Sequence, residues 1–505
     1  MTYFIGIDVG TFESKGVLTD ASGTIVAQAV SRHQMIVPRP GWAEHRPDED
    51  WWGDTVAITR ELLAKSGVDP RDIKAVATSA IGPCMLPLDG GGKPLMNGVL
   101  YGVDTRAVEE INFLTQKIGA ETLLARCNSG LTSQSVGPKI LWLKNKRPDI
   151  YAQARMFVSA TPYITYRLTG DYAMDHFTAA GFTPLYDPAA QRWSPEFADG
   201  IVDLAHLPRL LWSHEIAGTI TAAAAAETGL AVGTPVVCGT IDAAAEALSV
   251  GVTAPGDMMM MYGSTIFIIQ ITAAQVRDPR LWYAPWLFPG LHASQAGLAT
   301  SGTLTRWFAD QVFRDKPAAD VMGEMAQEAA TSPAGAKGLI VLPYFSGERT
   351  PLHDPRAKGV IFGLDLTHTR ADVYRGALEG IGYAVRHIVE TFEAVGHAPN
   401  RIVAVGGGTR NGAWLGAVSD ISGQPQVLRQ VTTGASLGDT FLAALATGHA
   451  TLTDIEIWNK AARIQHPDKA VKALYDHQYA VYRALYTQTK HLMATLSEVD
   501  GGAAL

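Results

Sequence analysis

A glycine turn near the N-terminus carries residue types that could bind a phosphate. The run Asp8-Val9-Gly10-Thr11 follows an apolar segment, and Lys15 lies shortly after it. Glycine lets the backbone approach a phosphate, the amides and the Thr11 hydroxyl can donate to its oxygens, and Lys15 can add a positive charge. Asp8 could hold a hydrated Mg²⁺ near the transferred group. An ordinary hairpin with a surface lysine remains the alternative interpretation.

Two later glycine turns could complete a nucleotide site. Gly263-Ser264-Thr265 interrupts an apolar run and could cradle phosphate from the opposite side. Gly406-Gly407-Gly408 precedes a predicted helix near Asn411, so adenine or ribose could lie against its backbone, and the helix N-terminus favours anions. Each run could also be a plain turn. A Rossmann site is the runner-up for the second run, but the GxGxxG spacing is not met and no βαβ unit begins there.

Asp242 is a candidate general base. It follows the strand-like run Val236-Val237-Cys238-Gly239 and is flanked by small residues. A carboxylate at the exit of a buried strand is well placed to take a proton from an attacking hydroxyl, a role worth about 10²–10⁴ in rate. Aspartate is also a frequent helix N-cap, so this second interpretation stays open.

The elements that must position these residues form two similar halves. The N-terminal half predicts strands over 3–9, 16–19 and 24–30, a helix from Pro47-Asp48 and a strand over 73–78, which is mixed α/β and not a βαβ barrel. A strand over 258–262, the glycine turn and a returning strand over 266–271 repeat the opening arrangement about 250 residues later. This repeat predicts two related lobes that face each other.

The remaining segments predict further elements. Helices are expected near 106–118, 137–146 and 194–204, within an insertion at about 80–235 that we expect to carry substrate contacts. The second half continues with a helix over 303–313, a strand over 338–342, a long helix at about 370–395 and a strand over 401–405. A helical stretch at 467–497 closes the chain.

Bulk composition fits this organisation. The 505 residues allow two to four domains with a cleft between them, and 47% hydrophobic with 18% charged residues is ordinary globular composition. The net charge of −8 gives no support to nucleic-acid binding. The apolar run 258–271 is short and interrupted, so no membrane span is expected. Cys84, Cys127 and Cys238 form no CxxC pair, which argues against a disulfide framework or a zinc site and for a cytoplasmic location.

Several ordered motifs resemble those of the FGGY carbohydrate kinases, most closely their xylulokinase-type branch. The resemblance is densest in the run from Ser346 to Pro355 (SGERTPLHDP). Glu348 and Arg349 could also hold this turn together by their own contact. The other matching blocks are Gly6–Thr11, Gly41–Glu44, Trp51-Trp52, Asp104-Thr105-Arg106, Tyr166–Gly170, Pro255-Gly256-Asp257, Gly359–Leu364, Thr369–Ala371, Ala377–Gly380 and Gly406–Gly408.

The resemblance implies an α/β fold of two actin/hexokinase/Hsp70-like (ribonuclease H-like) domains, with ATP between them and the sugar deep in the cleft. It implies an N-terminal kinase domain over 1–250, a C-terminal nucleotide-binding domain over 251–460, and a helical segment over 461–505 that packs back on the body. A homodimer is common in the family. The resemblance assigns the role of base to Asp242, and sugar contacts to Asp104 and Asp242. It assigns magnesium to Asp8 and adenosine contacts to Gly407, Gly408 and Asn411. The residues assigned to phosphate are Gly10, Thr11, Lys15, Gly263, Ser264 and Thr265.

The departures from the xylulokinase pattern lie on the sugar side. A Met-His-Gly element is replaced by Gly82-Pro83-Cys84, a Trp-Asn pair by Gly102-Val103, and the polar residue after the base by Ala243. The run around Asp242 is closer to ribulokinase-like relatives. We therefore predict an ATP- and Mg²⁺-dependent kinase of a small sugar, with a ketopentose such as xylulose first. The alternatives are a ribulokinase-like enzyme, a glycerol or erythritol kinase, and an inactive nucleotide-binding relative.

Overall fold

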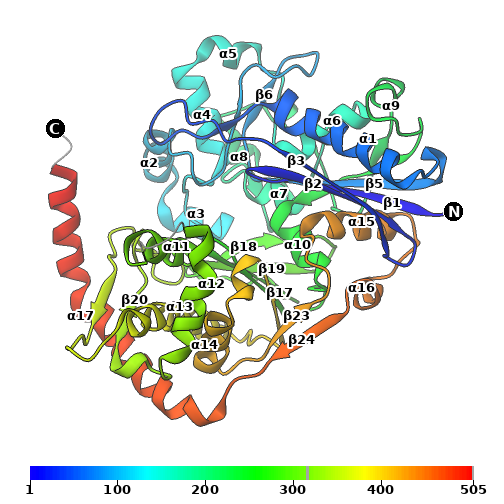
Figure 1. Cartoon of the computed structure of the whole chain (residues 1–505). Helices are drawn as coiled ribbons and strands as arrows, with labels where there is room; N and C mark the ends of the chain where they lie inside the picture. The colour runs from blue at the N-terminus through cyan, green and yellow to red at the C-terminus, as the bar shows by residue number, and fades with distance from the viewer. Residues whose placement is uncertain (314–317, 503–505) are drawn as a thin grey trace.

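The computed structural model describes residues 1–313 and 318–502 and contains one mixed sheet in each half of the chain (Figure 1). Both sheets have seven strands. The first contains β1 (Tyr3–Val9), β2 (Glu13–Asp20), β3 (Ile25–Arg32), β5 (Ile73–Ala80), β13 (Ile216–Thr219), β14 (Pro235–Val237) and β15 (Thr240–Ile241). The second contains β16 (Asp257–Tyr262), β17 (Ile266–Thr272), β18 (Trp282–Pro285), β19 (His292–Leu298), β22 (Arg401–Val405), β23 (Gln426–Arg429) and β24 (Ala461–Gln465).

The two sheets share one connectivity, which confirms the predicted repeat. In the first, β1 pairs antiparallel with β2, β2 with β3, and β1 lies parallel to β5. In the second, β16 pairs antiparallel with β17, β17 with β19, and β16 lies parallel to β22. In each sheet, a crossover connection after the antiparallel strands brings a parallel strand beside the first strand: β5 beside β1, and β22 beside β16. The ends of β1 and β16 therefore occupy equivalent positions.

The central strands are apolar because helices cover both faces of each sheet. In β16, Met258 and Met260 join the core formed with α13 (Arg370–Ala394) and α14 (Gly412–Ser422). Met259 points to the opposite face, into a core shared with α10 (Asp242–Ser249) and α15 (Ala435–Ala446). In the first sheet, α1 (Asp54–Ser66) packs on β2 and β3 while α15 packs on β1 and β5.

The predicted insertion has its own hydrophobic core. Its expected helix over 194–204 is wrong: only Pro195–Ala198 is helical, because the chain turns at Gly200, whose φ is 79°. Besides α1, the other helices from β3 to β14 are the π-helical turn Pro47–Gly53, the 3₁₀ turns Pro70–Asp72 and Leu204–His206, α2 (Val108–Ile118), α3 (Ala120–Cys127), α4 (Val136–Lys146), α5 (Pro148–Gln153), α6 (Ala160–Thr169), α7 (His176–Ala180) and α9 (Ala222–Thr228). Two-stranded pairs are β4 (Glu44–His45) with β7 (Gly98–Val99), β6 (Leu86–Leu88) with β8 (Met156–Val158), β9 (Ala173–Asp175) with β12 (Arg209–Leu211), and β10 (Tyr186–Asp187) with β11 (Arg192–Trp193).

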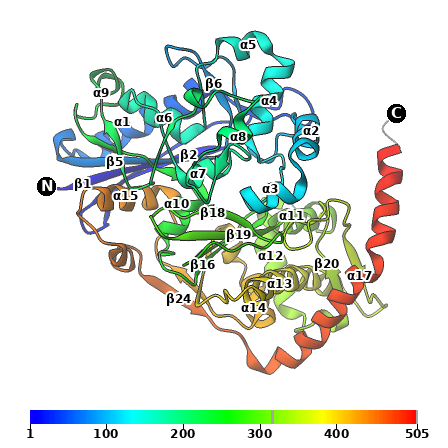
Figure 2. The same ribbon diagram turned by 180° about the vertical axis from the view of Figure 1, so that it is seen from behind.

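The second half ends in a long helix that packs back on the body. The helix α17 (Lys472–Gly502) runs along this half and carries the C-terminus outward (Figure 2). Tyr475 donates to Glu379 of α13, and the Tyr482 and Tyr344 hydroxyls lie 2.6 Å apart. The segment 461–505 nevertheless begins with β24, which pairs with β23. The remaining elements are α11 (Gly302–Gln311), α12 (Ala318–Thr331), α16 (Ile455–Trp458) and the strand pair β20 (Ile340–Leu342) with β21 (Val360–Phe362).

No helix within residues 1–313 and 318–502 combines the length and apolarity needed to cross a membrane.

The helix α15 connects the two halves by unusually close backbone contacts. A Cβ atom on Gly6 of β1 would lie 2.1 Å from the carbonyl oxygen of Ser436 in α15. A Cβ on Gly438 of α15 would lie 1.9 Å from the carbonyl oxygen of Ala245 in α10. Only glycine permits these approaches, so α15 lies between β1 and α10 (Figure 1).

We predict that Gly438→Ala destabilises the protein. The new methyl group must separate α15 from α10, and overpacking of this kind costs about 1–3 kcal/mol. Gly416→Ala is the matched control, because Gly416 also lies within a helix and its added Cβ would meet nothing within 4 Å. The midpoint of thermal unfolding should fall for the first variant and not for the second. Equal midpoints would contradict this account of the α10–α15 contact.

Candidate functional site

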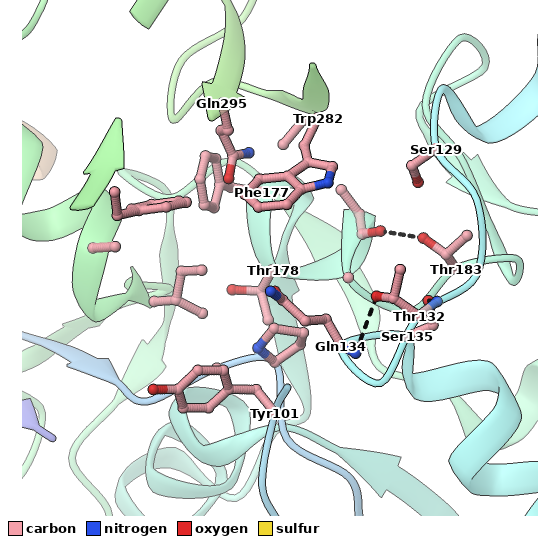
Figure 3. A pocket seen from close by; sticks show the side chains of 18 of the residues that line it. Tyr101, Ser129, Thr132, Gln134, Ser135, Phe177, Thr178, Thr183, Trp282 and Gln295 are labelled. Carbon is pink, nitrogen blue, oxygen red and sulfur yellow. Dashed lines mark hydrogen bonds between the residues drawn. The ribbon is translucent and has the colours of Figure 1, made fainter. Parts of the chain in front are cut away.

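A cavity of about 280 Å³ lies between the two halves (Figure 3). Trp282 and Gln295 enter it from the second sheet, and Tyr101 lies on the opposite side. The predicted insertion supplies much of the remaining wall, as expected. The other lining residues are Gly82, Pro83, Ser129, Gly130, Thr132, Gln134, Ser135, Phe177, Thr178, Ala180, Gly181, Thr183, Ile241, Asp242, Ala243, Met261, Thr265, Phe267, Tyr283, Ala284 and Arg349.

Asp242 lies on the cavity wall as the first residue of α10. Ile241 is the N-cap of this helix, and the Asp242 carboxylate accepts a 2.8 Å hydrogen bond from the neighbouring amide of Ala243. The N-cap interpretation is therefore wrong. Burial raises the pKa of Asp242 to about 6, against the opposing effect of the Ala243 hydrogen bond. A carboxyl group with such a pKa suits proton abstraction near neutral pH.

Three further carboxylates surround Asp242. Burial and the charges of Asp242 and Glu246 raise the pKa of Asp8 well above its usual range. Burial followed by the charge of Asp242 raises the pKa of Glu246 to about 7. Asp439, on α15, has a raised pKa because of burial and the charge of Asp8. The Ser79 hydroxyl donates to Asp439 Oδ2 over 2.7 Å and lies 3.5 Å from Asp8 Oδ1.

Asp8 and Asp242 of this acidic cluster were predicted from the sequence as site residues, whereas Glu246 and Asp439 were not. Glu246 lies four residues after Asp242 on the same helix, a spacing that brings side chains together, so it could have been found. Asp439 carries no comparable signal, because only the packing of α15 places it beside β1.

The cluster fits a hydrated divalent cation. Its members supply the oxygen ligands that Mg²⁺ prefers, and Asp439 Oδ1 is buried without a hydrogen-bond partner among the described residues. In those residues, no group of three or more acidic, histidine or cysteine side chains is arranged so that it could hold a metal ion by itself. Mg²⁺ commonly keeps several waters and uses one or two carboxylates together with substrate phosphates, so an incomplete protein site is compatible with this ion.

The two predicted phosphate turns present unpaired amides. In the first, the Gly10 amide donates to the Glu13 carbonyl over 3.1 Å, while those of Thr11 and Phe12 have no acceptor within residues 1–313 and 318–502. Lys15 stands beside this turn, where its ammonium group pairs with Glu13 at 2.9 Å. Neighbouring unpaired amides in a turn form a concavity suited to an anion.

The second turn has the same property. The Gly263 amide donates to the Thr265 carbonyl over 3.0 Å, whereas the amides of Ser264 and Thr265 have no acceptor in the described part of the chain. Thr265 and Asp242 both line the cavity. The structure therefore brings this turn and the predicted base to the same cavity.

Tyr101 connects the first turn to the same cavity. Burial and the charge of Asp242 raise the pKa of its phenol, while a hydrogen bond with Thr11 and the charge of Arg349 act in the opposite direction. Tyr101 therefore lies near Thr11, from the first half, and near Arg349, from the second half.

The Gly406–Gly408 run adopts the predicted position between a strand and a helix. Gly407 is exposed, and a Cβ there would meet nothing within 4 Å, whereas one on Gly408 would lie 2.4 Å from the Trp414 ring. Gly408 is therefore required by packing. Asn411 caps α14, since its Oδ1 accepts from the Trp414 amide at 3.1 Å. Contacts of these residues with adenosine remain predictions.

Asp104 is not brought to the cavity. It is fully buried, and its carboxylate accepts from the Ala43 amide at 2.7 Å and from Arg106 Nε at 2.9 Å. Arg106 also donates to Glu44 and lies 3.9 Å from the Trp42 ring. In this arrangement the Asp104 carboxylate is bonded to the segment around Ala43, and it is not among the residues that line the cavity. Of the sequence departures, Gly82, Pro83 and Ala243 line the cavity, while Val103 does not.

Arg349 is a cavity residue that the sequence analysis did not assign. The expected contact between Glu348 and Arg349 is present, but it uses the backbone of Arg349: Glu348 Oε1 accepts from the Arg349 amide at 2.7 Å. No carboxylate in the described residues lies within ion-pair distance of the guanidinium. Arg349 and Asp242 are the charged side chains of the described lining. The SGERTP motif could have directed attention to Arg349, whereas nothing in the sequence marks Trp282 or Gln295.

Comparisons with known proteins agree with this arrangement. Residues 3–249 match the family model for the N-terminal domain of the FGGY family of carbohydrate kinases, and residues 258–447 match that for its C-terminal domain. A Bacillus subtilis xylulose kinase is 29% identical over 506 residues, covering 98% of this chain and 99% of that protein. An Escherichia coli xylulose kinase is 29% identical over 499 residues, covering 97% and 100%.

A crystal structure of xylulose kinase from Rhodospirillum rubrum superposes with a TM-score of 0.91 at 31% identity, covering 97% of this chain and 99% of that one. The predicted fold of two actin/hexokinase-like domains is therefore confirmed. The chain belongs to the FGGY family of carbohydrate kinases, ATP-dependent enzymes that transfer a phosphoryl group to a sugar hydroxyl.

Proposed function

We propose that this kinase phosphorylates a ketopentose such as xylulose, with Asp242 as the general base. The observation that carries the proposal is the position of Asp242 on the wall of the cavity that Thr265 of the second glycine turn also lines. The relatives named xylulose kinase, which match over nearly the whole chain, support the choice of sugar.

The residues have separate tasks in this proposal. A sugar hydroxyl enters the cavity and gives its proton to Asp242 as its oxygen attacks the terminal phosphorus of ATP. The bond from this phosphorus to the bridging oxygen breaks, and ADP leaves with that oxygen. Thr11 and Phe12 bind phosphate oxygens from one side and Ser264 and Thr265 from the other, through their amides. Phosphoryl transfer depends mainly on such positioning and charge stabilisation. Closure of the two lobes over the bound substrates would exclude water, which would otherwise compete as the acceptor.

Charge near the transferred group is balanced by two further features. Asp8 would hold a hydrated Mg²⁺, which when bound neutralises phosphate charge and relieves the repulsion among the buried carboxylates. Arg349, without a carboxylate partner in the described residues, is available for the negative charge of the phosphoryl group. Gln134, Gln295 and Thr132 are the polar side chains that we expect to contact sugar hydroxyls.

Ribulose and polyols are the second candidates, since Pro83 and Ala243 line the cavity where xylulokinase-type chains carry polar side chains. A homodimer and a cytoplasmic location also remain predictions. The three cysteines are buried free thiols, as a reducing compartment would keep them.

The acceptor can be identified by a coupled ADP assay across ketopentoses, ketohexoses and polyols. We expect xylulose to give the highest kcat/KM, followed by ribulose. Erythritol or glycerol as the best acceptor would overturn the choice of sugar but leave the kinase assignment intact. Absence of acceptor-dependent ADP release from every compound would favour an inactive relative.

Replacing Asp242 by asparagine tests the base. Asp242→Asn keeps the size of the side chain but cannot accept the proton, so turnover should fall by at least about 10². Nucleotide affinity, measured by calorimetry with ADP, should change little. Near-normal turnover would exclude Asp242 as the base.

The pH dependence of kcat/KM offers a second test of the same residue. The pKa of Asp242 is about 6, and only its ionised form can accept a proton. The rate should therefore be maximal above this value and fall about tenfold per pH unit below it. A flat profile down to pH 5, with the coupling enzymes in excess, would contradict the assignment.

A further inference from the structure

Two buried histidines contact the first glycine turn. His33 Nε2 lies 3.0 Å from the carbonyl oxygen of Gly10, and His45 Nε2 lies 3.0 Å from that of Thr11. The His33 backbone amide donates to the next carbonyl, that of Phe12, over 3.1 Å. His45 has no exposed surface and His33 only 9%. Neither histidine lines the cavity. Together they are the hydrogen-bond partners of all three carbonyl groups of the turn, those of Gly10, Thr11 and Phe12.

The partner of His45 fixes its tautomer. Trp51 Nε1 can only donate, and it lies 3.1 Å from His45 Nδ1, which must therefore accept. The ring proton is then on Nε2, where it donates to the Thr11 carbonyl. Burial lowers the pKa of His45 to about 4, so the ring is neutral at physiological pH. His45 thus acts as one donor and one acceptor.

The partners of His33 favour the charged ring. Its Nδ1 lies 2.8 Å from Asp54 Oδ2, so both of its nitrogens face acceptors and both can donate when protonated. Burial lowers the pKa of His33, but the hydrogen bond and charge of Asp54 outweigh this and raise it overall. Ser14 and Ser31 donate to Asp54 at 2.7 and 2.6 Å and hold the carboxylate in place.

The second turn is held in an equivalent way by other groups. The Gly302 amide donates to the Gly263 carbonyl over 3.1 Å, and the Thr303 amide donates to the Ser264 carbonyl over 3.0 Å. These residues begin α11. In both halves, therefore, the turn carbonyls are hydrogen-bonded to the protein, while two adjacent amides have no acceptor among residues 1–313 and 318–502.

We propose that His33 and His45 are positioning residues for nucleotide binding, which hold the turn so that the Thr11 and Phe12 amides meet the phosphates of ATP. The inference rests on the proposed function, which places phosphate at this turn. A turn peptide released from its histidine can rotate, present its carbonyl oxygen to the anion and withdraw an amide donor. His33 adds a positive charge that, because the ring is buried, is weakly screened by solvent.

The test compares His45→Leu with His45→Gln. Leucine removes both hydrogen bonds, whereas the glutamine amide offers one donor and one acceptor, as the neutral imidazole does. Calorimetry would measure the affinities for ADP and for adenosine, which lacks phosphate. We expect His45→Leu to weaken ADP binding about tenfold, His45→Gln to weaken it by less than about threefold, and adenosine affinity to stay constant.

Control variants separate this role from a structural one. His466→Leu alters an exposed histidine outside the site and should leave both affinities unchanged. If His45→Leu does not fold, His33→Gln replaces it, because both N–H groups of a glutamine amide are on one nitrogen, whereas the imidazolium donates to Asp54 and to Gly10 from two separate ring nitrogens. Unchanged ADP affinity, or equal weakening of ADP and adenosine, would overturn the inference. Failure of the parent protein to bind ADP would instead refute the proposed function.

Discussion

The close packing of α15 between β1 and α10 determines how the two halves of the molecule meet. Gly6 and Gly438 allow backbones to approach within distances that any side chain would prevent. This contact brings a helix from the end of the chain against the first strand. Asp439, one residue after Gly438, is thereby placed beside Ser79 and Asp8. The buried carboxylate cluster therefore combines Asp8, near the start of the sequence, with Asp439 of α15, and its geometry depends on where α15 packs.

This arrangement concentrates negative charge in a buried place. Asp8, Asp242, Glu246 and Asp439 each have a raised pKa, and burial is the largest cause in every case. Lys15 opposes the shift of Asp8 and of Glu246, but its ammonium group also pairs with Glu13. Like charges in a medium of low polarity are unfavourable unless a cation joins them. The cluster therefore favours binding of a positive ion, which in a kinase would accompany the nucleotide.

The two glycine turns show how one local geometry can be obtained from different residues. Equivalent strand connectivity places a turn after β1 and after β16, and each turn leaves two neighbouring amides without acceptors in the described residues. The carbonyls of the first turn are bonded mainly by imidazole rings, and those of the second by the first residues of a helix. Phosphate binding depends on the direction in which the turn amides point. Different groups can therefore hold the turn carbonyls in the two halves, as long as the amides keep that direction.

Local patterns in the sequence determined much of the secondary structure, the division into two lobes and the choice of the candidate base. Alternating apolar runs and glycine turns predicted β1, β2, β16 and β17, and their repetition predicted two lobes. The position of Asp242 after a strand marked it as a candidate base, because residue type and spacing near a strand end are local properties. The shortened helix at Pro195 shows the limit of such patterns, since one turn at Gly200 ended it.

The tertiary structure decided which distant residues share the site. Arg349 lines the cavity without a carboxylate partner in the described residues, Asp104 is turned inward onto Arg106, and Asp439 reaches Ser79 from the opposite end of the chain. None of these positions follows from neighbouring residues. Each depends on how helices and loops pack across the sheets, and that packing is set by contacts between segments far apart in the sequence.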